Sequence, residues 1–152
     1  TAIRVVASET ANWKIDEAYE VTRKMFELHP GIGLLFAAND MMALGALRYL
    51  SDNGLSSVKV AGFDALPEIR TMVDQGKLAV TVDQRSAEQG YQGVLYAIRL
   101  LKGEKVPSET LIDVELVSAE VGPGLRLNIM TIKFAAPLAE SARCSWVGGG
   151  CG

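Results

Sequence analysis

The sequence predicts an α/β fold, built as an open parallel sheet with helices on both faces. Short apolar runs alternate along the chain with stretches of helical periodicity, in the order strand, helix, strand, helix. Three of these runs end on a polar side chain: Asn39, Asp64 and Gln84. Because the ligand crevice of such a sheet lies outside the carboxyl ends of its strands, the pattern indicates a binding module.

The first elements are expected within residues 3–54. Residues 3–7 are rich in β-branched side chains and are predicted to form a strand. Residues 15–29 carry apolar side chains at helical spacing, and Pro30-Gly31 ends that helix. A second strand runs into Asn39, and the helix that follows it is expected to close at Gly54.

The remaining elements repeat the alternation. A strand ending at Asp64 precedes a helix over residues 67–75, and a strand ending at Gln84 precedes a helix over residues 86–101. Ser86 and Gln89 have the spacing of a capping box at the start of that helix. Residues 111–117 alternate as a last strand, whereas 127–135 are only mildly strand-like.

Composition and charge restrict the class of function. The 152 residues are 49% apolar and 22% charged, which suits one globular core. The net charge is −3 with lysine and arginine scattered, so no nucleic acid partner is expected. Cys144 and Cys151 lie in a glycine-rich tail, and their spacing fits no common zinc pattern.

No catalytic residue and no metal ligand set is predicted. His29 lies at a helix end without a serine or cysteine nucleophile nearby in sequence, and no Walker, G-x-G-x-x-G or H-E-x-x-H motif occurs. The acidic residues Asp16, Glu17 and Glu20 are interpreted as a solvated face near a helix start. We therefore expect a protein that is not an enzyme and that uses no cofactor.

The predicted ligand-binding residues are Trp13, Asn39, Asp64 and Gln84. An indole at a loop mouth can stack on the apolar face of a sugar ring, while a carboxylate and amides bind its hydroxyls. Each residue also has an ordinary structural interpretation. Asn39 suits a helix N-cap, Asp64 a turn cap, Gln84 a surface amide and Trp13 a packing residue.

Four segments together resemble the ribose-binding-protein-like periplasmic sugar receptors. They are Phe-Ala-Ala-Asn-Asp-Met-Met-Ala-Leu-Gly-Ala-Leu from Phe36, Val-Ala-Gly-Phe-Asp from Val60, Gly-Lys-Leu-Ala-Val-Thr-Val-Asp-Gln from Gly76, and Leu-Lys-Gly-Glu-Lys-Val-Pro from Leu101. The resemblance covers residues 3–120 and implies the carboxyl-terminal lobe of a type I periplasmic binding protein, incomplete here. It also implies that Asn39, Asp64 and Gln84 hydrogen-bond a sugar and that Trp13 stacks on it; tryptophan in place of the ribose receptor's phenylalanine implies an altered pocket.

The resemblance further implies a domain division and a set of partners. Residues 1–120 form the lobe, residues 85–113 contact an amino-terminal lobe that this chain lacks, and residues 121–152 form an atypical tail or linker. The expected function is the sugar-binding component of an ABC-type transport system, with a monosaccharide bound between two lobes. The expected partners are a membrane permease and either the missing lobe or a second copy of the chain.

Two alternatives for compartment and class stay open at this level. The resemblance implies a periplasmic protein or an extracellular one tethered to a membrane. The alternative function is the effector-binding domain of a LacI-like transcriptional regulator, which resembles the same fold. Residues 69–78 are closer to the receptors than to the repressors.

Overall fold

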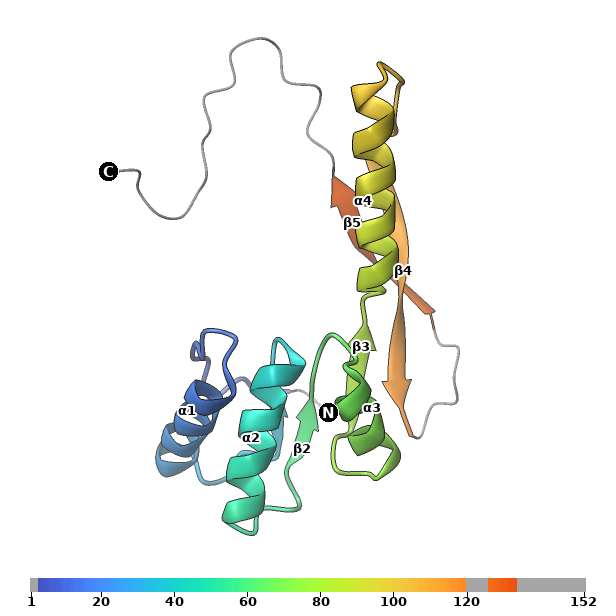
Figure 1. Ribbon diagram of the computed structural model, residues 1–152. Helices are drawn as coiled ribbons and strands as arrows, with labels where there is room; N and C mark the ends of the chain where they lie inside the picture. Colours follow the sequence, from blue (N-terminus) through green and yellow to red (C-terminus); the bar gives the residue numbers. More distant parts are fainter. Residues whose placement is uncertain (1–2, 120–125, 134–152) are drawn as a thin grey trace, which may run out of the picture.

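The computed structural model describes residues 3–119 and 126–133, which form four helices and one five-stranded sheet (Figure 1). In chain order the elements are α1 (Ile15–Leu28), β1 (Leu34–Phe36), α2 (Asp40–Asp52), β2 (Lys59–Ala61), α3 (Pro67–Asp74), β3 (Val80–Asp83), α4 (Ser86–Leu101), β4 (Glu109–Ser118) and β5 (Arg126–Lys133). The predicted α/β class and the alternation of strands and helices are confirmed.

The sheet is mixed rather than wholly parallel. Its strand order is β1-β2-β3-β4-β5, and β1, β2 and β3 are parallel as predicted. β4 pairs antiparallel with β3, with Thr81 opposite Val117. The reason is visible in Figure 1: α4 continues beyond the carboxyl end of β3 instead of crossing back over the sheet, so the chain returns in the opposite direction. The expectation of an all-parallel sheet is wrong for its last two strands.

The predicted strand over residues 3–7 is wrong. This segment has no regular structure, and Ile3 and Val5 are 83% and 79% exposed. A strand exists only where its N–H and C=O groups pair with a neighbour. β1 is the edge of the sheet, and within the described residues no strand lies beyond it. Residues 3–7 pair with no strand of the described residues, so their β-branched composition alone does not make them a strand.

The core lies where α1 packs on α2 and where α2 and α3 pack on the parallel strands. The ring of Tyr49 on α2 contacts Tyr19 and Phe26 of α1, at centroid separations of 5.5 and 5.8 Å. The buried cluster consists of Phe26, Ala37, Ala43, Tyr49, Leu50, Val60, Ile69, Val73 and Leu78. This packing fixes the carboxyl ends of β1, β2 and β3 relative to one another.

Helix ends follow the sequence signals with one exception. Gly54 and Gly76 adopt positive φ angles of 68° and 69° after α2 and α3, the conformation that closes a helix and favours glycine. The capping box at Ser86 is wrong. α4 begins after Arg85, which has a left-handed φ of 55°, and the Gln89 amide donates instead to the backbone oxygen of Gln84 at 2.5 Å.

The segment predicted to be mildly strand-like does form a strand. β5 pairs antiparallel with β4, from Glu109 opposite Lys133 to Glu115 opposite Arg126, with an irregularity between Ile112 and Val114. The backbone of residues 126–133 therefore extends the sheet. Cys144 and Cys151 lie outside the described residues.

Candidate functional site

The carboxyl ends of three adjacent parallel strands carry three of the four predicted ligand-binding residues. Asn39 follows β1, Asp64 follows β2 and Gln84 follows β3. β1 pairs with β2 and β2 with β3, so the three residues lie along one edge of the sheet. This is the edge at which the sequence placed the ligand crevice.

Asp64 and Gln84 are in direct contact. The Gln84 amide Nε2 donates a hydrogen bond to Asp64 Oδ1 at 2.5 Å, and both side chains are half-buried. Asp64 is not the N-cap of α3, because that position is Leu66 and no side chain caps the helix; its role as a cap of the preceding turn stays a prediction. The contact joins a carboxylate to an amide and leaves the second carboxylate oxygen available to a hydroxyl group.

Asn39 has the structural role that its sequence position allowed. Its side-chain oxygen accepts a hydrogen bond from the Met42 N–H at 2.9 Å, which caps α2. The cap uses the oxygen, and among residues 3–119 and 126–133 the amide NH2 group of Asn39 has no hydrogen-bond partner. The same residue can therefore cap α2 and donate to a ligand at the strand edge.

Trp13 is exposed at a tight loop before α1. Its side chain is 64% exposed, so it is not the packing residue of the ordinary interpretation. Asn12 and Trp13 have positive φ angles of 48° and 63°, and Lys14 N donates to Ala11 O at 3.0 Å across the turn. The structure shows no contact between Trp13 and the three strand-end residues; it shows an indole that is accessible to a ligand.

A buried carboxylate that the sequence analysis missed lies beneath this edge. Asp40 at the start of α2 is fully buried, accepts from Leu66 N and from the Thr81 hydroxyl, each at 2.8 Å, and Thr81 is itself fully buried. Burial raises the pKa of Asp40, and the hydrogen bonds from Leu66 and Thr81 act in the opposite direction. In sequence, an acid after an N-cap indicates only a favourable helix dipole, so no local signal could have found this network.

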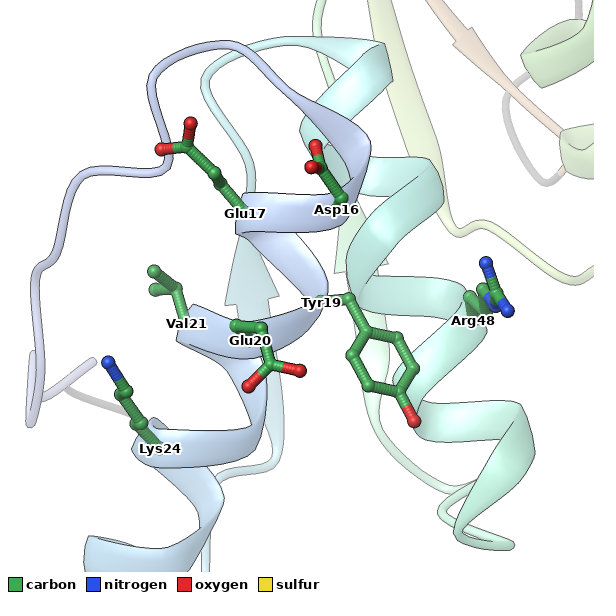
Figure 2. Close-up of a pocket in the computed structure, with 7 residues that line it drawn as sticks. All are labelled: Asp16, Glu17, Tyr19, Glu20, Val21, Lys24 and Arg48. Atoms are coloured by element: carbon green, nitrogen blue, oxygen red, sulfur yellow. The ribbon is translucent and has the colours of Figure 1, made fainter.

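A hollow in the described residues lies elsewhere. It measures about 580 Å³, lies on the outer surface between α1 and α2, and is lined by charged and aromatic residues (Figure 2). They are Asp16, Glu17, Tyr19, Glu20, Val21, Lys24 and Arg48. Its acids are largely ion-paired: Glu17 with Lys14 at 2.6 Å and Glu20 with Arg23 at 3.0 Å. The hydrogen bond from Lys14 lowers the pKa of Glu17. This face matches the solvated acidic patch of the sequence.

Helix α4 presents an uncovered apolar surface, which we call the α4 face: Tyr91, Val94, Ile98 and Leu101. These side chains are between 46% and 89% exposed. Only Tyr96 of this helix is buried, and its hydroxyl lies 3.1 Å from that of Thr110 on β4. Figure 1 shows α4 standing away from α1, α2 and α3. The α4 face is therefore largely uncovered by the described residues.

The described residues contain neither a cluster of metal ligands nor a membrane-spanning helix. No cluster of three or more histidine, cysteine, aspartate or glutamate side chains is placed to hold a metal ion in residues 3–119 and 126–133. Among the helices of the same residues, none combines the length and apolar character needed to cross a membrane.

Comparison with known proteins identifies a family whose model matches most of this chain. The family model described as "Periplasmic binding protein domain" matches residues 1–105. The chain belongs to this family. Its members are periplasmic binding proteins by name, and the match includes Trp13 and all three strand ends.

Curated relatives of this periplasmic binding protein domain carry sugar-binding names. The chain is 42% identical over 113 residues to the ribose import binding protein RbsB of Escherichia coli, covering 74% of this chain and 38% of the relative. It is 34% identical over 122 residues to the D-ribose/D-allose-binding protein of Pseudomonas aeruginosa, covering 77% and 38%. The chain thus spans about two fifths of the length of the relatives it matches. The first name describes a binding protein for import, and the second a sugar-binding protein.

Solved structures of periplasmic binding proteins match the fold. A solute-binding protein of an ABC transporter from Actinobacillus succinogenes, with bound D-allose, gives a TM-score of 0.73 at 35% identity, over 77% of this chain and 42% of that one. One from Bacillus halodurans, with bound myo-inositol, gives 0.72 at 36% identity, over 77% and 41%. Both support an α/β lobe of this family.

Proposed function

We propose that this chain supplies one lobe of the sugar-binding component of an ABC-type import system. The observation that carries the proposal is the convergence of three polar strand ends, in which Gln84 donates to Asp64 across two adjacent strands. The relatives named for ribose and allose support a monosaccharide as ligand. Binding is the whole task of such a site, so no bond is made or broken.

Each of the four residues has a distinct proposed role. The Asp64 carboxylate accepts from sugar hydroxyls, and the amide groups of Asn39 and Gln84 supply donors and acceptors beside it. A hydrogen bond that fixes Gln84 on Asp64 leaves fewer rotamers to order when the ligand arrives. Trp13 is exposed and stacks on the less polar face of the ring.

The proposed site needs a second wall. A ligand pocket encloses most of its ligand, whereas Asp64 and Gln84 lie on an open edge and the chain spans 38% of its relatives' length. We therefore assign the opposite wall to an amino-terminal lobe, with closure of the two lobes on the sugar as the signal to a membrane permease. The family supports a periplasmic location for the complete protein.

The α4 face is the surface proposed to meet that lobe, or a second copy of the chain where the lobe is absent. Contiguous exposed apolar side chains of this size mark an interface. Light scattering should give a dimer for the chain on its own, or a monomer whose α4 amides exchange slowly because another segment covers them. A monomer in which the α4 amides exchange freely would contradict this assignment.

The LacI-like regulator is not retained as a second candidate. The reported relatives are binding proteins for import, and no feature of the described residues favours effector sensing.

Isothermal calorimetry on the full-length protein tests the proposed function. We expect heat on titration with at least one of D-ribose, D-allose and myo-inositol. Asp64→Ala and Gln84→Ala should each weaken binding by about fivefold or more, since a lost charged or neutral hydrogen bond costs about 1–3 kcal/mol. Asp74→Ala, an exposed acid at the end of α3, is the matched control and should leave affinity unchanged. Silence with every sugar of a wider pentose and hexose panel would refute the proposal.

A further inference from the structure

The loop between β2 and α3 holds two consecutive residues in a backbone conformation that they rarely adopt. Asp64 and Ala65 have φ angles of 113° and 56°, and neither is glycine. Such residues persist only where the surrounding structure holds them, since each is strained by comparison with an extended or helical backbone. The direction in which Asp64 points therefore depends on whatever fixes this loop.

Buried polar groups beneath the loop hold its backbone. Asp40 Oδ2 accepts from Leu66 N at 2.8 Å, and Asp40 Oδ1 accepts from the Thr81 hydroxyl at 2.8 Å. The Thr81 oxygen in turn accepts from Ala65 N at 3.3 Å. Asp40 and Thr81 are both fully buried. The Asp40 carboxylate thus binds the Leu66 amide directly and the Ala65 amide through the Thr81 hydroxyl.

The carboxylate lies close against the backbone that leads into the loop. A Cβ atom on Gly62 would lie 2.3 Å from Asp40 Oδ1, so the backbone of the segment leaving β2 lies directly against the acid. On the solvent side, Arg70 Nε donates to Ala65 O at 3.1 Å, and its guanidinium pairs with Asp83 at 2.5 Å. The loop is held from inside by Asp40 and from outside by Arg70.

We propose that Asp40 is the positioning residue of the ligand site: it holds residues 63–66 in the strained conformation that directs the Asp64 carboxylate onto Gln84. The inference rests on the proposed function and assigns to a fully buried side chain a share of the affinity for sugar. Asp40 touches no ligand. Its contribution passes directly to Leu66 N and, through the Thr81 hydroxyl, to Ala65 N, the two residues that follow Asp64.

Two substitutions separate the parts of this role. Asp40→Ala removes both acceptors and lets the loop relax toward unstrained angles. Asp40→Asn keeps one oxygen for Leu66 N and turns the second contact into a donor toward Thr81, so it restores part of the network. We expect the Kd for D-ribose or D-allose to rise about tenfold or more in Asp40→Ala and less in Asp40→Asn.

Leu50→Ala is the matched control for a general loss of stability. Leu50 lies on the same helix, is 4% exposed, and belongs to the core cluster far along the helix from the loop. Titrations are compared at a temperature where circular dichroism shows all variants fully folded. Leu50→Ala should lower the melting temperature and leave Kd within twofold. Equal Kd shifts in Leu50→Ala and Asp40→Ala, or none in Asp40→Ala, would overturn the proposal.

Amide hydrogen exchange supplies a readout that needs no ligand. The Leu66 and Ala65 amides should be protected in the wild type and in Leu50→Ala, and should lose protection selectively in Asp40→Ala. If no sugar binds the wild-type protein, the proposed function fails, while exchange still decides whether Asp40 holds the loop. Unchanged exchange at Leu66 in Asp40→Ala would refute that role on its own.

Discussion

Replacement of Gly45 by alanine is expected to destabilise the protein, against the usual effect of this change within a helix. Gly45 lies inside α2 where α1 packs on it. A Cβ atom there would lie 2.1 Å from the backbone oxygen of Ile15 and 2.8 Å from the Cβ of Ala18. Both distances are far below van der Waals contact, and a backbone oxygen cannot rotate aside as a flexible side chain can.

The sign of the effect follows from two opposing magnitudes. Alanine is favoured over glycine in a helix interior by about 1 kcal/mol. Overpacking a close contact costs about 1–3 kcal/mol, and this contact lies at the upper end or beyond because α1 must move away from α2. The pairs that Tyr49 makes with Tyr19 and Phe26 would loosen with it. We expect a net loss of about 2 kcal/mol in the free energy of unfolding.

Urea denaturation followed by circular dichroism measures this loss as a fall in the midpoint at constant slope. Gly90→Ala is the matched control. Gly90 lies inside α4, and a Cβ there meets nothing within 4 Å, so alanine should raise stability by about 0.5–1 kcal/mol. A Gly45→Ala midpoint at or above that of the wild type would refute the close helix contact. So would a fall of the same size in Gly90→Ala.

Two further predictions concern the strand edge. Asn39→Ala should lower the free energy of unfolding by about 1 kcal/mol through loss of the α2 cap, while Asn39→Ser should restore stability without restoring sugar affinity, since serine caps but lacks the amide donor. Thermal melts and calorimetry on the same samples separate the effect on stability from the effect on affinity. Recovery of affinity in Asn39→Ser would contradict the ligand role. Stability should also depend on pH through Asp40, because burial raises its pKa above the ordinary value of 3.8. The folded state then holds the proton more tightly than the unfolded state. The contribution of Asp40 to the free energy of unfolding therefore declines as pH rises from 3.8 through the raised pKa. Asp40→Asn should flatten that part of the stability profile, and a profile identical to that of the wild type would show that Asp40 does not titrate there.

Local patterns in the sequence were sufficient for most of the fold. The capping-box signature at Ser86 and the apolar positions up to Leu101 placed the helix at residues 86–101, the bounds that the structure shows, although the capping contact itself does not form. Glycine at positions 54 and 76 marked helix ends because only glycine adopts positive φ without strain. These signals act within one turn of backbone, so they can be recognised in the sequence without knowing which elements pack nearby.

Two of the failures share a physical cause, which is that they depend on partners distant in sequence. Residues 3–7 have strand composition, yet a strand also needs a neighbour to pair with. No strand of the described residues pairs with them. The direction of β4 depends on where α4 carries the chain, which helical periodicity does not encode. The capping box at Ser86 is a local failure: α4 begins after Arg85, and the Gln89 amide donates to the backbone oxygen of Gln84.

The site divides in the same way. The placement of Asn39, Asp64 and Gln84 along one edge of the sheet could be predicted, because each follows an apolar run and parallel pairing of β1, β2 and β3 aligns such positions. Asp40 could not, because its partners Leu66 and Thr81 lie 26 and 41 residues away. Yet the direction of the Asp64 carboxylate follows from this buried acid, since the loop that carries Asp64 is strained and needs a support. A sequence that kept Asp64 and Gln84 but lost Asp40 would therefore still match the exposed pattern of a sugar site while placing its carboxylate wrongly.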